Sequence, residues 1–193
     1  MLETTPSGAA DTRNRVLDAA ERIVHARGVA ALTLDAAARE AGVSKGGLLY
    51  HFATKEALLA ALMQRLAAFI RADFEATRER VPPGPGRTAR AVLAWHFGGC
   101  SMGDERLDRA TAVFLATFHH DPALLDPVRA VLAEIRAAAE AEGLPPGHGL
   151  AVLLACDGLF MAHMFRLWQP DEAQKAALQQ VLTGLVEAGR CDA

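Results

Sequence analysis

Six polar side chains and two neighbouring glycines between residues 33 and 55 have types suited to hydrogen bonding with a polyanion. Ammonium, phenol, imidazole and hydroxyl groups all donate to phosphate oxygens, and a glycine lets the backbone come close to a ligand. Basic side chains can also donate to base edges, which is how proteins read DNA sequence. The residues are Thr33, Ser44, Lys45, Gly46, Gly47, Tyr50, His51 and Lys55.

Two short helices joined by a turn are predicted to position these side chains. Thr33 is a good N-cap for a helix over 34–41, and Gly42 can take the positive φ at which helices commonly end. Ser44 can cap a second helix over about 45–52. Because the first residues of such a second helix can reach base edges in the major groove, the spacing predicts a helix-turn-helix reader of DNA. An ordinary helical hairpin with a solvated polar face is the alternative.

Composition is compatible with a DNA-binding protein. The chain has 193 residues, 51% of them hydrophobic, so it can bury a sizeable core. Its net charge is −3, yet residues 11–55 hold seven Lys and Arg against five Asp and Glu, a balance of +2. Residues 1–10 lack the features of a signal peptide and no apolar stretch is long enough to span a bilayer, so we expect a cytoplasmic protein without a membrane partner. The three widely spaced cysteines indicate reduced thiols.

Beyond residue 55, apolar residues recur at helical spacing and no segment alternates with the two-residue period of a strand, so we predict an all-α fold. The clearest break is the Pro- and Gly-rich segment 82–86. Outside the helix-turn-helix, helices are expected over about 11–27, 55–80, 87–100, 105–118, 122–142, 149–168 and 171–188.

At the helix-turn-helix the sequence resembles the TetR family of bacterial transcriptional regulators, over about residues 12–62. Several separate elements agree with the family in order and spacing. The matching residues are Ala19, Ala20, Gly28, Thr33, residues 38–44, Leu48, His51, Phe52, Lys55, Glu56 and Leu58.

The resemblance implies about nine helices, and it implies that the eight polar and glycine residues given above face double-stranded DNA. Tyr50, His51 and Lys55 are then expected at phosphates. Two positions depart from the family pattern, because Gly47 stands where Thr or Ser is usual and Leu49 where a phosphate-contacting Tyr is usual. Tyr50 offers a substitute for the lost phenol.

The helix predicted over 149–168 is apolar nearly all round, so it must be covered on both sides. Small residues four, three and four positions apart form a stripe for close packing, and the helix over 171–188 offers an apolar face for the same junction. Because a helix-turn-helix reader usually needs two copies one DNA turn apart, we predict a homodimer on a palindromic operator; packing inside one chain is the alternative. The predicted interface residues are Ala151, Ala155, Gly158, Ala162, Leu178, Val181, Leu182 and Leu185.

The opposite side of the same helix carries Met, aromatic and Asp side chains, and further aromatic residues occur in helices expected nearby. Such a set can line an apolar pocket, or it can be ordinary core. The TetR resemblance implies an effector that binds in the C-terminal part and weakens operator binding, so we interpret the chain as a repressor released by a small apolar molecule. The predicted effector residues are Trp95, His96, Phe114, Phe118, Asp157, Met161, Met164, Phe165 and Trp168.

Other functions are weighed against this interpretation. His96, Cys100, Cys156 and His163 could meet around zinc or copper, which would make a metal-responsive regulator, but nothing in the sequence shows that they meet, and we predict neither a metal nor another cofactor. A helical adaptor that binds protein is a further alternative. No Gly-rich phosphate loop or nucleophile elbow occurs, so we do not expect an enzyme.

The domain organisation predicted from these patterns has three parts. They are a flexible N-terminus over 1–10, a helix-turn-helix DNA-binding domain over 11–55, and a helical effector-binding and dimerisation domain over 56–193.

Overall fold

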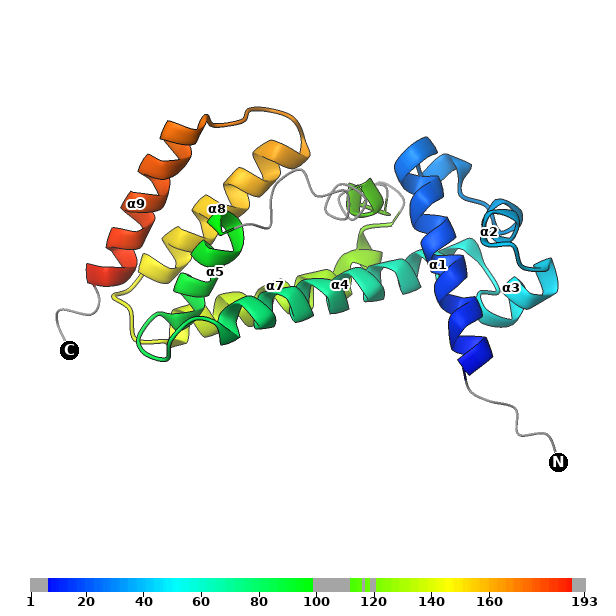
Figure 1. Cartoon of the computed structure of the whole chain (residues 1–193), viewed down its shortest axis with the longest axis horizontal. Coiled ribbons are helices and arrows are strands. Elements are labelled where there is room, and N and C mark those ends of the chain that lie inside the picture. Colours follow the sequence, from blue (N-terminus) through cyan, green and yellow to red (C-terminus); the bar gives the residue numbers. More distant parts are fainter. Residues whose placement is uncertain (1–6, 99–111, 116, 119–120, 189–193) are drawn as a thin grey trace. The chain divides into compact units, whose positions relative to one another are not determined.

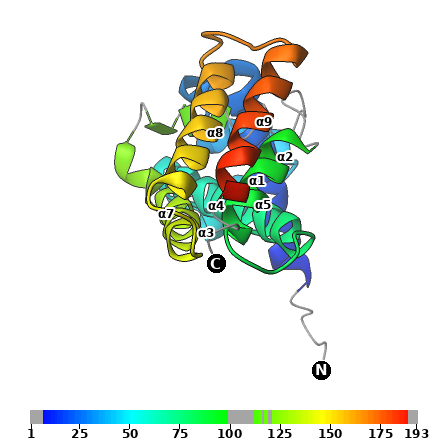
Figure 2. The same cartoon turned by 90° about the vertical axis from the view of Figure 1, so that its left-hand side faces the viewer.

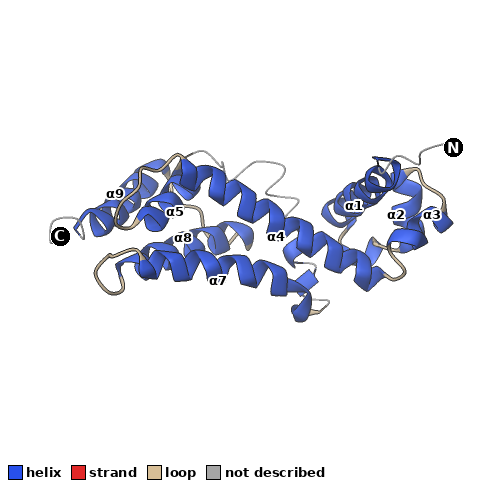
Figure 3. Ribbon diagram, turned by 90° about the horizontal axis from the view of Figure 1, so that it is seen from below, coloured by secondary structure: helices blue, strands red, loops and turns tan. Residues whose placement is uncertain are grey.

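The computed structural model describes residues 7–98, 112–115, 117–118 and 121–188, and within these ranges it contains helices and no strands (Figures 1 and 3). The all-α prediction is confirmed. By its internal contacts the chain divides into two compact units, which we call the head (residues 1–67 and 105–128) and the body (residues 68–104 and 129–193). No helix in the described ranges is long and apolar enough to cross a membrane.

The head is built from short helices around one apolar core. Its elements are α1 (Ser7–Arg27), the 3-10 turn η1 (Val29–Ala31), α2 (Leu34–Ala41), α3 (Lys45–His51), the start of α4 (Lys55–Glu79) and the 3-10 turn η2 (Pro122–Leu125). Leu48 of α3 and Leu58 of α4 are both 0% exposed in this core. Val113 and Leu125 join it from a distant part of the sequence, so the head extends beyond residue 55, where the sequence pattern placed its end.

Side-chain caps and a left-handed glycine shape the helix-turn-helix as predicted. The Thr33 Oγ1 accepts a hydrogen bond from the backbone N–H of Ala36 at 3.0 Å. The Ser44 Oγ accepts from the N–H of Gly47 at 3.1 Å. Gly42 has a φ of 63°, which a side chain would strain, and it ends α2. These contacts are local in sequence, which is why composition and spacing suffice to predict them.

The body contains the rest of α4 together with α5 (Arg87–Phe97), most of α7 (Asp126–Ala141), α8 (His148–Met164) and α9 (Glu172–Ala188). α8 and α9 run side by side and α5 packs against both (Figures 1 and 2). Of the helix predicted over 105–118, residues 112–115 and 117–118 are helical and the remainder lies outside the described residues.

Helix α8 ends earlier than its apolar pattern predicts. α8 was expected to reach Trp168 but ends at Met164. Arg166 adopts a φ of 52°, and the N–H of Leu167 bonds back to the carbonyl of Ala162 at 2.9 Å, which is a Schellman ending with arginine where glycine is usual. The segment predicted as one helix over 122–142 starts as the 3-10 turn η2 before α7 begins.

Candidate nucleic-acid interface and body cleft

α3 buries its apolar side in the head and turns its polar side to solvent. Leu48 (0% exposed) and Phe52 (3%) anchor it, whereas Leu49 is 41% and Tyr50 82% exposed. Of the residues predicted to face DNA, Thr33, Ser44, Lys45, Gly46 and Tyr50 are exposed, and Gly47, His51 and Lys55 are half-buried. The Tyr50 and His51 rings touch edge to face, with centroids 5.1 Å apart. A polar surface with one prominent phenol therefore faces solvent on α3.

The two glycines of α3 have different surroundings. A Cβ atom on Gly47 would lie 3.2 Å from the Oγ of Ser44, the atom that caps α3, so packing within the chain explains this glycine. A Cβ on Gly46 would meet no atom within 4 Å. Because a glycine inside a helix costs about 1 kcal/mol relative to alanine, Gly46 calls for a reason outside the chain, and close approach by a ligand would supply one.

Both lysines predicted to meet DNA have partners within the head. The Lys55 Nζ donates to the carbonyl oxygen of Val29 at 2.9 Å and so ties the start of α4 to η1, a structural role that the sequence did not indicate. The Lys45 Nζ pairs with the Oδ1 of Asp35 at 2.9 Å. An ammonium group has three hydrogens to donate, so each lysine can still donate hydrogen bonds to a further acceptor.

The residues predicted to line an effector pocket are distributed over both units. Phe114 packs against the head core and Phe118 also belongs to the head, whereas Trp95 is in the body. The prediction that Phe114 lines a pocket in the body is therefore corrected: its ring contributes to the core that holds α3. In the body, Met164 is 7% exposed, and Met161, Phe165 and Trp168 are 38%, 51% and 54% exposed.

Trp95 is fixed against α4 in the body. Its Nε1 donates to the Oδ2 of Asp73 at 2.7 Å, and its ring packs edge to face on Phe74 with 5.7 Å between centroids. The neighbouring His96 has its Nδ1 at 3.0 Å from the carbonyl oxygen of Val92 on the same helix. Burial lowers the pKa of His96, which therefore favours the neutral imidazole.

The charge of Asp157 on α8 acts against this burial and raises the pKa of His96. Displacement of water by neighbouring groups raises the pKa of Asp157, although its side chain is solvent-exposed. The charges of His96 and Arg136 act on the pKa of Asp157 in the opposite direction. His96 of α5 and Asp157 of α8 thus each favour the charged form of the other.

Three of the four side chains considered as metal ligands lie within the described residues. Burial raises the pKa of the Cys156 thiol to about 12, which disfavours the thiolate that binds metals. The Nδ1 of His163 lies 3.2 Å from the Nε2 of Gln169. Cys100 lies outside the described residues, among which no three His, Cys, Asp or Glu side chains are grouped to hold a metal ion.

A cleft of about 200 Å³ lies between α4, α5 and α7 in the body. Its lining residues are Arg71, Phe74, Glu75, Arg78, Thr88, Val131, Glu134, Ile135 and Ala138. Phe74, Val131 and Ile135 are 2%, 3% and 9% exposed and form an apolar floor. Sequence reasoning missed all of these residues. The available signal was the spacing of Arg71, Glu75 and Arg78, which places three charges on one face of α4.

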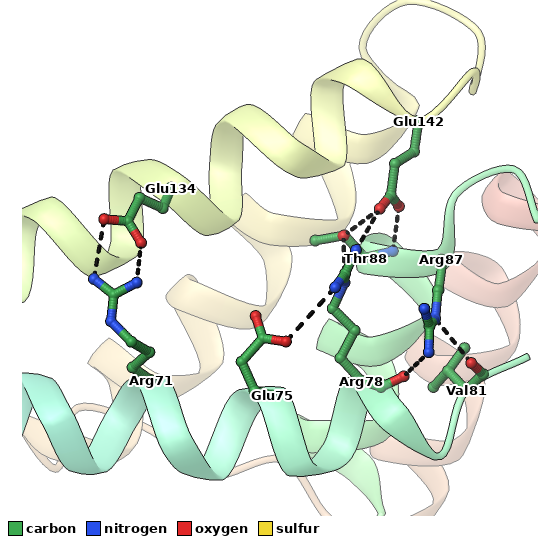
Figure 4. Close-up of polar contacts among 8 residues, drawn as sticks. All are labelled: Arg71, Glu75, Arg78, Val81, Arg87, Thr88, Glu134 and Glu142. Carbon is green, nitrogen blue, oxygen red and sulfur yellow. Dashed lines mark hydrogen bonds and ion pairs between the residues drawn. The ribbon is translucent and has the colours of Figure 1, made fainter. Parts of the chain in front are cut away.

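Ion pairs border the cleft (Figure 4). Arg71 of α4 donates two hydrogen bonds to Glu134 of α7, one of them from Nη2 to Oε1 at 3.0 Å. These bonds lower the pKa of Glu134 and raise that of Arg71. Glu75 is held more loosely, since its Oε2 lies 3.6 Å from the Nη1 of Arg78 and its side chain is 52% exposed.

Glu142, at the end of α7, joins three helices next to the cleft (Figure 4). Its carboxylate accepts hydrogen bonds from the backbone N–H of Thr88 and, at 2.7 Å, from the hydroxyl of Thr88, so it caps the start of α5. It also lies 3.3 Å from the Nη2 of Arg78 at the end of α4. Arg78 and Glu142 therefore link α4, α5 and α7.

α8 and α9 expose much of the surface predicted to meet a second subunit. On α8, Ala151 and Gly158 are exposed, and Ala155 and Ala162 are half-buried. On α9, Val181 is 63% exposed, and Leu178 and Leu185 are half-buried. Leu182 differs from the prediction, because at 4% exposed it packs inside its own subunit.

Comparison with known proteins identifies both parts of the chain. Residues 16–62 match the model of bacterial regulatory proteins of the tetR family, and residues 86–187 match the tetracyclin repressor-like C-terminal domain. Among curated proteins, the HTH-type transcriptional regulator SrpR of Pseudomonas putida is 38% identical over 74 residues, which cover 38% of this chain and 35% of SrpR. The chain thus spans about a third of the length of that relative.

Solved structures agree over nearly the whole chain. A TetR family member from Streptomyces coelicolor A3 is 27% identical, with a TM-score of 0.65 over 91% of this chain and 98% of that one. The multidrug binding protein EbrR, solved with ethidium, is 27% identical, with a TM-score of 0.61 over 91% of this chain and 98% of that one. The prediction made from the helix-turn-helix is confirmed, and the chain belongs to the TetR family of bacterial regulatory proteins.

Proposed function

We propose that this chain is a homodimeric transcriptional repressor that binds a palindromic DNA operator through α3 and is released when a small molecule enters the cleft of the body. The observation that carries the proposal is the position of α3, whose Leu48 is buried while Lys45, Gly46 and Tyr50 face solvent. A helix anchored on one side and polar on the other suits the major groove.

Local chemistry of the head supports DNA binding. The exposed phenol of Tyr50 can donate to phosphate, and Gly46 leaves room for a sugar-phosphate backbone beside α3. The starts of α2 and α3 are capped by hydroxyl groups of Thr33 and Ser44. Backbone N–H groups at such helix starts attract phosphate oxygens. Lys45 at the first position of α3 is placed to reach a guanine edge.

Selection from random double-stranded DNA should enrich a palindromic sequence whose half-sites are about one helical turn apart. Binding to the selected operator should weaken steeply as salt rises, because phosphate contacts release counterions. The measurement is selection with the full-length protein followed by fluorescence anisotropy at several salt concentrations. Recovery of unrelated sequences, with no preference over scrambled DNA at low salt, would refute DNA reading and favour an adaptor.

Exposed surface on α8 and α9 supports the dimer. Gly158 and Val181 leave apolar surface in solvent on the two neighbouring helices, and a second copy with the same surface would cover it. Small side chains such as Ala151 and Ala155 allow helix axes to come close. Two heads held by one dimer can then bind both half-sites, which strengthens operator binding well beyond that of a single head.

The cleft supports the effector part of the proposal. It has an apolar floor and a charged rim, the composition of a site for a small amphipathic molecule. Its volume of about 200 Å³ suits a ligand smaller than most drugs. Arg71 and Arg78 already contact carboxylates, whereas the Glu75 carboxylate is loosely paired, so a ligand with a cationic group is favoured. Ethidium, which EbrR binds in its solved complex, is likewise an aromatic cation.

Two helices can carry the signal of an occupied cleft to the head. α4 begins in the head at Lys55 and supplies cleft residues from Arg71 onward. α7 begins directly after Leu125, which is buried in the head core, and reaches the cleft at Val131. A ligand can weaken operator binding by favouring one position of these helices. A coupling free energy of about 1–3 kcal/mol between ligand binding and DNA binding corresponds to about 5- to 150-fold weaker operator binding.

Benzamidine should bind the cleft more tightly than benzoate, because the two molecules have similar size and opposite charge and the loosely paired rim group is Glu75. Trp95 packs on Phe74 at the cleft floor, so its fluorescence reports binding in a chain whose exposed Trp168 is replaced by Phe. Titrations with both compounds measure the preference. At saturation, benzamidine should also weaken operator binding of the wild type.

Two alanines of α7 provide the matched control for the cleft. Ala138 lines it, so Ala138→Leu should fill the space and abolish the benzamidine response. The neighbouring Ala137 is exposed and does not line it, so Ala137→Leu should respond as the wild type does. Equal responses in the two variants would place the ligand elsewhere and refute the cleft as the effector site.

A further inference from the structure

Four charged side chains line the cleft of the body, two of each sign. They are Arg71, Glu75, Arg78 and Glu134. Arg71 and Glu134 satisfy each other through two hydrogen bonds between α4 and α7 (Figure 4). The charge that the cleft presents to a ligand therefore depends on whether Arg78 and Glu75 pair equally well.

Arg78 directs two of its three guanidinium nitrogens at groups other than Glu75 (Figure 4). Its Nε donates to the hydroxyl oxygen of Thr88 and its Nη2 donates to Oε1 of Glu142, each at 3.3 Å. Its Nη1 lies 3.6 Å from Oε2 of Glu75, which is too long for a hydrogen bond. Thr88 and Glu142 thus hold the guanidinium, and Glu75 does not.

Glu142 is better placed than Glu75 to keep this guanidinium. The Glu142 side chain is 20% exposed and that of Glu75 is 52% exposed, so water and salt screen the charge of Glu142 less. The backbone N–H and the hydroxyl of Thr88 also donate to the Glu142 carboxylate and fix its position. Glu142 is not among the residues that line the cleft. A carboxylate outside the cleft therefore neutralises an arginine inside it.

We propose that Glu142 is a positioning residue for the effector: it holds the Arg78 guanidinium beside Thr88 and so keeps the Glu75 carboxylate available to a cationic ligand. The inference rests on the proposed function of the cleft. Without the Glu142 carboxylate, Arg78 can pair fully with Glu75, which lies three residues earlier on the same face of α4. The cleft would then hold two complete ion pairs and would lose its preference for a cation.

Glu142→Gln should lower the preference for benzamidine over benzoate about two- to fivefold, because the cation must then displace Arg78 from one exposed ion pair. Benzamide has a similar size and no charge, so it should bind the variant and the wild type equally. A purely structural role for Glu142, as the cap of α5, would instead weaken all three compounds alike. Isothermal titration calorimetry with the full-length protein measures the three affinities.

The ends of the three helices keep other bonds when the Glu142 side chain is changed. The N–H of Gly86 donates to the backbone carbonyl of Glu142 at 2.9 Å, and Arg87 donates to two carbonyl oxygens at the end of α4. Glu75→Gln is a second test, which does not depend on the stability of Glu142→Gln. It should lower the benzamidine preference by at least the same factor, and a Glu75→Gln protein with the full preference would contradict the inference.

Glu140→Gln is the matched control, because it removes the same charge from an exposed position of α7 that does not line the cleft. It should leave the ratio of the benzamidine and benzoate affinities unchanged. In an Arg78→Gln background, Glu142→Gln should no longer lower this ratio, since the guanidinium that Glu142 positions is absent. An unchanged ratio in Glu142→Gln, an equal effect of Glu140→Gln, or a full effect in the Arg78→Gln background would overturn the inference. A wild type that binds none of the three compounds would refute the cleft as the effector site, and the inference with it.

Discussion

Leu48→Ala should abolish operator binding and lower the melting temperature of the head. Leu48 is 0% exposed and anchors α3 in the head core. Removing a buried leucine side chain costs about 2–5 kcal/mol, which is a large share of the stability of so small a unit. Helix α3 would then lose the orientation that turns Lys45 and Tyr50 to solvent. Circular dichroism melting and DNA anisotropy measure the two effects.

The adjacent leucine supplies the control for this prediction. Leu49 is 41% exposed, so Leu49→Ala makes the same chemical change and leaves no cavity in the core. Its melting temperature should stay within a few degrees of the wild type, because surface substitutions usually change stability by less than about 0.5 kcal/mol. If Leu48→Ala melts as Leu49→Ala does and still binds the operator, Leu48 does not position α3.

Gly158→Leu should convert the dimer into a folded monomer and weaken operator binding at least about 100-fold, since each head would then bind alone. A Cβ atom on Gly158 meets no atom within 4 Å in the single chain, so the subunit itself has room for the larger side chain. A partner helix packed closely on the stripe has no such room. Sedimentation velocity measures the oligomeric state, and circular dichroism shows that the subunit remains helical.

Ala137→Leu is the control for side-chain size. It enlarges an exposed residue of α7 outside the stripe of small residues on α8, and it should leave the dimer intact. A Gly158→Leu protein that remains dimeric with full operator affinity would show that Gly158 is not at the subunit contact. The dimer could then use another surface. A monomeric wild type at micromolar concentration would remove the dimer altogether.

Features fixed by neighbouring residues could be predicted from the sequence. The hydroxyls of Thr33 and Ser44 cap helices three residues away, and Gly42 supplies a backbone conformation that few other residues adopt. Tyr50, which was predicted to face DNA, is likewise 82% exposed. All these features depend on backbone geometry within one or two turns of helix.

Features that depend on helices distant in sequence could not be predicted. The ring of Phe114 suits a pocket or a core equally well, and only the packing of the chain assigns it to the head. The cleft needs Arg71 and Glu134, 63 residues apart, to meet across two helices. Periodicity shows which face of a helix is apolar, but it does not show which other helix covers that face.

Hydrogen bonds on both sides of its tip secure the turn between α4 and α5. The Arg87 side chain donates to the carbonyl oxygens of Val81 and Arg78 at 2.9 and 3.0 Å, and the start of α5 is capped by Glu142. The tip, residues 82–85, is exposed. The tip also accepts bonds from α5, at the carbonyl oxygens of Pro82 and Gly84, but the bonds of Arg87 and Glu142 do not involve it. We therefore expect that an affinity tag or fluorescent label inserted between Pro83 and Gly84 leaves both helix ends in place. The protein can thus be attached to a surface through this turn. None of the side chains assigned here to DNA, the second subunit or the cleft lies in it.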